Sequence, residues 1–268
     1  FEATRKKLPL GIAIIDKAYR NEISPRQLFF RLREFTQAEL QIFFDSEEMN
    51  KLEDEKWNKV KDYKLILYQK SKLHEISVAE LNSKQKIPKL YAYNMAKVQK
   101  FYLDILQIPK SKFRLRELGE DERAFYNKIH FDVELCIDSI GGFKEVAGIH
   151  YRSDHDLTGH EKQSKKNLHV FYNNKQVLCH VLELSFGVDR NIWALMDLFY
   201  KEDKVENETR QMFSFPYTIA PVDVAIFPLV NKDGLPEIAE QVYEILNKNF
   251  SCIYDDSASI GRRYRRQD

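Results

Sequence analysis

Short segments with alternating or continuous apolar positions dominate the first part of the chain. Residues 11–20 are rich in β-branched residues, and residues 31–44 share this character after a polar stretch that contains the turn signal Ser24-Pro25. Such segments favour strands, and a turn between them favours an antiparallel hairpin. Strand patterns return at residues 131–137, 143–151 and 177–184. Because no regular helices separate these strands, we expect a mostly antiparallel sheet with helices packed on it.

Helical spacing of apolar residues marks other parts of the chain. Ser77 is followed three residues later by Glu80, which is a capping box. Residues 91–105 carry apolar side chains at helical intervals, and a further helix is expected over residues 188–200. Residues 53–112 contain no glycine and are rich in Lys, Asn and Tyr. We interpret this region as an insertion of short strands and helices, a solvated excursion without chemistry.

The pattern changes near Phe215, where a β-α-β unit begins. Residues 222–230 are almost continuously apolar, which is typical of a strand buried on both faces. Residues 237–249 then read as a helix with one apolar side, and residues 251–254 as a second strand. We therefore expect a second domain that begins after residue 214. The predicted organisation is a core at 1–52, an insertion at 53–112, a core at 113–214 and a second domain at 215–268.

Composition narrows the class of protein only a little. The chain has 268 residues with 42 basic and 41 acidic side chains, so net charge alone indicates no nucleic-acid partner. The three cysteines are far apart and lack metal-ligand spacing, which favours reduced thiols in a cytoplasmic protein. No apolar stretch approaches the ~18 residues of a membrane span, so no membrane association is expected. Because the chain starts at Phe1 and ends in what reads as the opening of a helix, we expect both ends to continue in a longer protein.

Five residues around the first hairpin have the chemistry of a nucleotide and ammonium site. Arg20 and Arg31 could bind phosphate oxygens, because guanidinium groups do so in bidentate fashion. Glu22 could accept from an exocyclic amine, and Phe35 offers a flat apolar face for stacking. Glu39 follows Phe35 by four residues, hence on the same strand face, and could hold an ammonium group. A cross-strand ladder of surface ion pairs explains the same pattern equally well.

Two further groups of residues are candidates. Gly187 and Arg190 open the helix expected at residue 188, directly after Glu183 and Ser185. Taken alone, this spacing indicates only a helix start. Near the end of the chain, four arginines could pair with nucleic-acid phosphates or form an ordinary basic helix face, and the pattern leaves both open: Arg262, Arg263, Arg265 and Arg266.

The order of these groups resembles the class II aminoacyl-tRNA synthetases. Residues 19–39 are similar to their motif 2, and residues 183–190 resemble motif 3. The stretches RNEISPR and REFTQAE, with segments between residues 114 and 157, are similar to the archaeal and eukaryotic branch of the glycyl-tRNA synthetase family. The resemblance implies an α+β fold in which the class II antiparallel sheet is flanked by helices and interrupted by the insertion. Residues 215–268 would then be part of an α/β anticodon-binding domain.

The resemblance also implies roles for individual residues. Arg20 and Arg190 would be the catalytic arginines, on the α-phosphate and the γ-phosphate of ATP. The remaining ATP contacts would be Glu22 to the adenine amino group, Arg31 to the phosphates and Phe35 stacked on adenine. The glycine site would consist of Glu39, Glu183 and Ser185. The four arginines at 262, 263, 265 and 266 would bind tRNA.

The implied activity is that of a glycine–tRNA ligase, which forms glycyl-adenylate from glycine and ATP and transfers the glycyl group to tRNA(Gly). The resemblance implies Mg²⁺ with the ATP, with Glu183 as a possible ligand but no certain metal site, and a homodimer. The sequence departs from the family pattern at Asp16 (glycine expected), Leu184 (proline expected) and His150-Tyr151 (Ala-Asp expected). Two alternatives remain: a catalytically silent paralogue acting as an accessory or nucleic-acid-binding subunit, and a class II synthetase for alanine, serine or proline.

Overall fold

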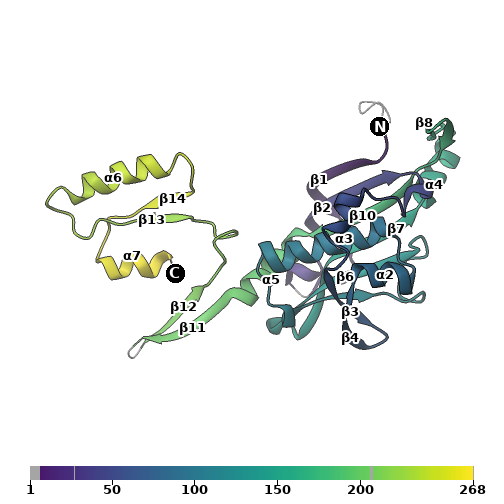
Figure 1. Ribbon diagram of the computed structural model, residues 1–268. Helices are drawn as coiled ribbons and strands as arrows, with labels where there is room; N and C mark the ends of the chain where they lie inside the picture. Colours follow the sequence, from purple (N-terminus) through teal and green to yellow (C-terminus); the bar gives the residue numbers. More distant parts are fainter. Residues whose placement is uncertain (1–6, 27, 206–207, 268) are drawn as a thin grey trace. The chain divides into compact units, whose positions relative to one another are not determined.

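The computed structural model describes residues 7–26, 28–205 and 208–267 (Figure 1). The chain forms two compact units, Phe1–Asp197 and Leu198–Asp268, which are treated separately below. The predicted domain boundary at residue 214 lies inside the second unit. The functional division of the chain into four segments stays a prediction.

The first unit is built on an eight-stranded sheet with the order β1-β2-β10-β7-β6-β5-β3-β4. Neighbouring strands are antiparallel except for β3 and β5, which pair in parallel. The strands are β1 (Leu10–Tyr19), β2 (Glu34–Phe44), β3 (Lys64–Gln69), β4 (Lys72–Ser77), β5 (Phe113–Glu117), β6 (Ile129–Ile137), β7 (Gly142–Ser153) and β10 (His180–Gly187). The predicted antiparallel sheet, with β1 and β2 as its first hairpin, is confirmed.

Helices α3 and α5 cover one face of this sheet (Figure 1). The helices of the unit are α1 (Asp54–Asn58), α2 (Val78–Gln85), α3 (Lys89–Lys100, continued by a π-turn at Phe101–Ile105), α4 (His155–Ser164) and α5 (Val188–Phe199). The predicted capping box at the start of α2 is present. Ser77 Oγ accepts from the Glu80 N–H at 3.2 Å, and the Glu80 carboxylate accepts from the Ser77 N–H at 3.3 Å.

Residues 53–112 belong to the core of this unit, so the interpretation of the region as a solvated excursion is wrong. Helix α3 buries seven of its twelve residues, and Leu65 and Leu67 of β3 are fully buried. The Tyr91 hydroxyl, at 0% exposure, donates to the Ile149 carbonyl of β7 at 2.6 Å. Composition concealed this packing because the lysines and glutamates of the region lie on its outer side. Whether the region is an insertion relative to the family stays a prediction.

The opposite face of the sheet is polar. Successive side chains of a strand point to opposite faces, and apolar and polar residues alternate along these strands. On the adjacent strands β2, β10, β7 and β6, the side chains of the polar face include Gln37, Glu39 and Gln41 of β2, Glu183 and Ser185 of β10, His150 and Arg152 of β7, and Asp132 of β6. Cross-strand register places Ser185 opposite Glu39, and Glu183 opposite both Gln41 and His150. Beside this face, a small hairpin of β8 (Val170–Tyr172) and β9 (Lys175–Val177) packs on Phe43 and Val181.

The second unit contains two pieces of sheet. Strands β11 (Tyr200–Val205) and β12 (Glu208–Phe213) form an antiparallel hairpin that the charged sequence did not predict. Strands β13 (Val224–Ile226) and β14 (Cys252–Tyr254) are parallel and joined through α6 (Leu235–Leu246), so the predicted β-α-β unit is confirmed. The first strand is only three residues long and mostly half-buried, so the expectation of a strand over residues 222–230 buried on both faces is wrong. Helix α7 (Ile260–Gln267) follows. Among the helices of the described ranges, none combines the length and the apolar run needed to cross a bilayer.

The contact between α3 and the sheet can be tested with Tyr91→Phe. This variant removes the hydrogen bond to Ile149, and we expect the free energy of unfolding to fall by about 1 kcal/mol in urea denaturation. Tyr93→Phe, on the same helix but half-buried, is the control and should change stability by less than about 0.5 kcal/mol. Equal effects of the two substitutions would contradict a specific role for the Tyr91 hydroxyl.

Candidate active site

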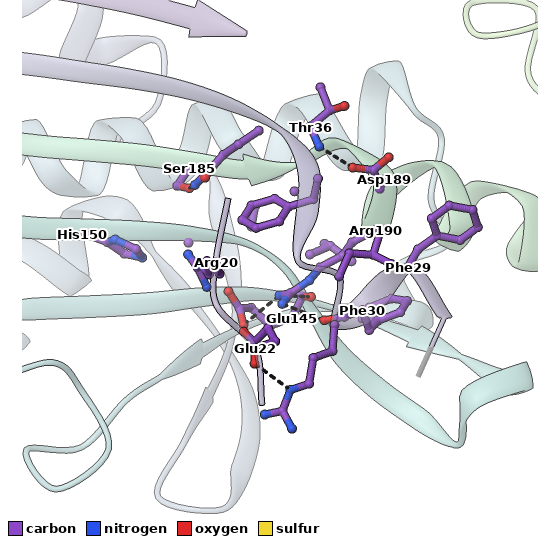
Figure 2. A pocket seen from close by; sticks show the side chains of 18 residues that line it. Arg20, Glu22, Phe29, Phe30, Thr36, Glu145, His150, Ser185, Asp189 and Arg190 are labelled. Carbon is purple, nitrogen blue, oxygen red and sulfur yellow. Dashed lines mark hydrogen bonds and ion pairs between the residues drawn. The ribbon is translucent and has the colours of Figure 1, made fainter. Parts of the chain in front are cut away.

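A pocket opens on the polar face of the sheet, between the β1–β2 turn, strands β2, β7 and β10, and the start of α5 (Figure 2). All five residues predicted to bind ATP line it: Arg20, Glu22, Arg31, Phe35 and Arg190. Figure 2 shows His150 and Ser185 at one end of the pocket and Asp189, Arg190 and Phe29 at the other. The structure therefore brings together residues separated by up to 170 positions in the sequence.

Arg20 and Phe35 form one wall of this pocket. The Arg20 guanidinium carbon lies 5.3 Å from the centre of the Phe35 ring, which is within the range of a cation–π contact. Backbone pairing positions the two side chains, because the Arg20 N–H donates to the Arg33 carbonyl at 2.8 Å where β1 ends. Arg31 and Glu22 make a long, exposed ion pair of 3.6 Å. Such a pair contributes little to stability, so both side chains are available to a ligand.

Arg190 is held at the far end of the pocket by the protein itself. Its guanidinium donates to the Phe30 carbonyl at 3.0 Å and pairs with the Glu145 carboxylate at 3.0 Å. A Cβ at Gly187 would lie only 3.2 Å from the Arg190 Cδ, so a larger residue here would require the arginine side chain to shift. Asp189, which the sequence did not single out, accepts from the Thr36 N–H at 2.5 Å and ties the start of α5 to β2. An acid in the first turn of a helix was the available signal.

A second cavity of about 270 Å³ contains the predicted carboxylates Glu39 and Glu183. Glu183 is 4% exposed, and both of its oxygens are engaged. Its Oε1 lies 3.1 Å from His150 Nδ1, and its Oε2 accepts from Arg152 Nη1 at 2.8 Å. Gln41 Nε2 lies 3.5 Å from carboxylate oxygens of both glutamates. Of these neighbours, His150 was noted in the sequence only as a departure from the family pattern, and Arg152 only as part of a segment similar to the family. Gln41 was missed because its place depends on strand register.

The two carboxyl groups have opposite pKa shifts. Burial and the negative charge of Glu183 raise the pKa of Glu39 above its usual value. Burial also disfavours the charge on Glu183, but the hydrogen bond from His150 and the charge of Arg152 hold the pKa of Glu183 below its usual value. The negative charge of Glu183 is thus stabilised by His150 and Arg152, whereas Glu39 has no comparable stabilising partners. A cation in this cavity would therefore stabilise the site, because it would offset the repulsion between the two acids.

Ser185 separates the arginine-lined pocket from the acidic cavity. Its hydroxyl accepts from Gln37 Nε2 at 2.5 Å, and both side chains also line the first pocket. Glu39 lies directly opposite Ser185 in the strand register. A ligand that extends from the phosphate-binding arginines to the carboxylates would therefore pass over Ser185.

The four arginines of α7 do not share one environment. Arg263 is 3% exposed, and its guanidinium donates to the carbonyls of Pro228, Asp256, Ser257 and Ala258. This geometry corrects its predicted role: Arg263 anchors the helix and is not presented to a phosphate. Arg262, Arg265 and Arg266 are exposed, and Arg266 also pairs with Asp255.

The role of Glu183 as a metal ligand stays a prediction. Its oxygens are already bound to His150 and Arg152. Within the described ranges, no three His, Cys, Asp or Glu side chains are grouped to hold a metal ion. A divalent ion at this site would have to obtain most of its ligands from elsewhere.

The raised pKa of Glu39 predicts that this residue destabilises the fold. An acid with a raised folded-state pKa binds its proton more tightly in the folded protein, so its ionisation above that pKa favours unfolding. We expect Glu39→Gln to raise the melting temperature at pH 7, and the gain to disappear below pH 4.5, the ordinary pKa of the group. Thermal unfolding across pH, with Glu75→Gln on the edge strand β4 as control, measures this. A lower melting temperature for Glu39→Gln at pH 7 would contradict the electrostatic interpretation.

Two proteins with similar sequences are both glycine–tRNA ligases. A glycine–tRNA ligase from Mycoplasma capricolum is 35% identical over 267 residues, which cover 98% of this chain and 49% of that protein. A glycine–tRNA ligase from Pyrococcus furiosus is 32% identical over an alignment of 349 residues, covering 98% of this chain and 60% of that protein. The chain therefore spans about half the length of the curated relatives it matches.

A solved structure and a family model agree with this. The crystal structure of prolyl-tRNA synthetase from Cryptosporidium parvum, complexed with L-proline and AMP, matches with a TM-score of 0.57 at 17% identity, covering 96% of this chain and 45% of that one. At this identity the likeness concerns the fold. The family model described as the tRNA synthetase class II core domain (G, H, P, S and T) matches residues 2–199, which is most of the chain. The chain therefore belongs to the class II aminoacyl-tRNA synthetase family.

Proposed function

We propose that this chain carries the amino-acid activation site of a glycine–tRNA ligase, followed by part of its anticodon-binding domain. The observation that carries the proposal is the junction at Ser185, where an arginine-lined pocket meets a cavity with two carboxylates. ATP needs cationic and aromatic groups, and an amino acid needs an acceptor for its ammonium. The names of the relatives support glycine as the amino acid.

In the proposed first step, the carboxylate oxygen of glycine attacks the α-phosphorus of ATP. The bond from this phosphorus to the bridging oxygen breaks, and pyrophosphate leaves with the electron pair. Arg20, near Phe35, is placed to neutralise charge on the α-phosphate, and Arg190 charge on the leaving pyrophosphate. Catalysis of this kind consists mostly of positioning and charge stabilisation.

The acidic cavity would orient glycine for this attack. Its ammonium would lie between Glu39 and Glu183, where a positive charge offsets the repulsion between the two acids. Ser185, at the junction, would lie beside the reacting carboxylate. In the second step, a hydroxyl of the terminal tRNA adenosine attacks the carbonyl carbon of glycyl-adenylate, and AMP leaves.

Magnesium would enter with ATP. Because both oxygens of Glu183 already accept a hydrogen bond and the described residues form no metal cage, phosphate oxygens and water would supply most of the ligands. The ion would neutralise phosphate charge. Arg20, Arg31 and Arg190 perform the same task from the protein side.

We also propose a cytoplasmic homodimer. Strand β1 leaves Ile12, Ile14 and Ile15 exposed by 42, 55 and 73%, which supports coverage of this edge by another part of the assembly. The three cysteines are unpaired, which suits a reducing compartment.

Pyrophosphate exchange tests the activity. We expect the full-length protein to exchange pyrophosphate into ATP with glycine, and much less with alanine, serine or proline. Arg20→Ala and Arg190→Ala should each lower the rate by at least about 100-fold, because each removes a charge-stabilising donor. Arg210→Ala is the matched control, since this arginine pairs with Asp203 in the second unit.

The outcome separates the remaining alternatives. Exchange with alanine, serine or proline in place of glycine would assign a different class II specificity. A folded protein that shows no exchange with any amino acid would support the silent paralogue, acting as an accessory or nucleic-acid-binding subunit.

Helix α7 provides a test of tRNA binding. We expect Arg262→Ala to weaken tRNA binding and lower the slope of log affinity against log salt by about 1, with no loss of stability. Arg263→Ala should instead destabilise the second unit by roughly 2–4 kcal/mol, because four backbone carbonyls lose their donor. Filter binding across salt concentrations and urea denaturation measure the two effects. Equal effects of both substitutions on binding and stability would contradict this division of roles.

A further inference from the structure

His150 occupies the centre of the polar face without a role in the mechanism described so far. It lies on β7, opposite Glu183 of β10 and His130 of β6, and its side chain is 18% exposed. The imidazole lies directly over Gly148, where an added Cβ would come within 2.1 Å of Nε2. Glycine at 148 is therefore required for this ring position, and His150 itself stands where the family resemblance leads us to expect alanine.

The two nitrogens of His150 have different environments. Nδ1 lies 3.1 Å from Oε1 of Glu183. Nε2 is buried and has no hydrogen-bond partner among the described residues. A proton on Nε2 alone would leave a buried donor without an acceptor and Nδ1 without a proton to donate. The contacts therefore select the tautomer in which Nδ1 carries the proton and donates it to Glu183.

The surroundings keep the imidazole in place. The His130 ring packs edge-on against it with centroids 4.2 Å apart, and His130 Nε2 is itself 2.9 Å from Asp132. On the other side of Glu183, Arg152 donates to Oε2 and is tied to Asp156 at 2.7 Å. Glu183 is thus held between two donors that bind different oxygens.

This arrangement limits what Arg152 can do. Guanidinium groups favour a two-pronged contact with both oxygens of a carboxylate. Because His150 occupies Oε1, Arg152 reaches only Oε2. Without His150, Glu183 could rotate into a two-pronged pair with Arg152 and turn away from Glu39.

We propose that His150 is a positioning residue that donates from Nδ1 to Glu183 and keeps this carboxylate directed, with Glu39, toward the ammonium of the amino acid. The proposal rests on the proposed function of the site. His150 acts through Glu183, since its Nδ1 faces that carboxylate and its Nε2 is buried against Gly148, so neither ring nitrogen is presented to the amino acid.

Two substitutions of His150 separate positioning from simple packing. In Asn, the side-chain nitrogen takes the place of Nδ1, whereas Ala has no donor. In pyrophosphate exchange we expect His150→Ala to raise the KM for glycine about 10-fold, with the KM for ATP changed less than about 2-fold. His150→Asn should stay within about 3-fold of the unchanged protein for both substrates. An unchanged glycine KM in His150→Ala, or equal impairment in both variants, would overturn the proposal.

A second measurement does not depend on activity. In ¹⁵N-histidine NMR of the full-length protein, the imidazole signals that disappear in His150→Asn should show a protonated Nδ1 and an unprotonated Nε2. The preference for this tautomer should weaken in Glu183→Leu, which has no acceptor for Nδ1. A protonated Nε2 with bare Nδ1 would overturn the proposal even if the protein activates glycine. A protein that exchanges no amino acid yet shows the expected tautomer would instead refute the proposed function and retain the contact between His150 and Glu183.

Discussion

The alternation of side chains across the sheet is the constraint on which the rest of the first unit depends. Each of the adjacent strands β2, β10, β7 and β6 directs one set of side chains toward the helix-covered core and the other toward the site. In β10, Leu182 and Leu184 therefore enter the core, while Glu183 and Ser185 belong to the site. A slip of one residue in β10 would exchange these sets and bury Glu183 among apolar side chains. The packing of the core and the geometry of the site are therefore fixed by the same register.

Burial of charge is tolerated on the polar face because the charges occur in connected sets. Glu183 is held by His150 and Arg152, and Arg152 is held in turn by Asp156. A buried ion without such partners would cost several kcal/mol. Glu39 is the exception, since its burial and the negative charge of Glu183 together outweigh the groups that favour its ionised form. The pair of Glu39 and Glu183 is therefore suited to binding a cation. The repulsion that favours a bound cation also lowers the stability of the protein without ligand.

Sequence patterns predicted local elements of structure well. They did not predict which distant strands pair or which side chains meet across the sheet. The β1–β2 hairpin, the capping box at Ser77 and the β-α-β unit of the second domain follow from signals within a few residues. The parallel pairing of β3 with β5 and the contacts of Gln41 depend on strands distant in the chain, for which the sequence contains no local signal. Arg263 shows the same limit, because four arginines within five positions look equivalent until one of them is buried. The predicted ATP-binding residues all line one pocket. This could be predicted only from the family resemblance, because no local pattern connects the two distant motifs.

The place of β10 in the sheet also bears on how the protein is assembled. Strand β2 has two neighbours, β1 and β10, and the nearest residues of β10 come more than 130 positions later, with Phe44 opposite His180. During synthesis the first hairpin therefore presents an unpaired edge, carrying Glu39 and Gln41, until β10 has left the ribosome. Contacts this distant in sequence slow folding and expose strands to mispairing. Because the same late strand contributes Glu183 and Ser185 and leads into Arg190, closure of the sheet and formation of a binding-competent site are one event, and a nascent chain that stops before residue 190 has neither.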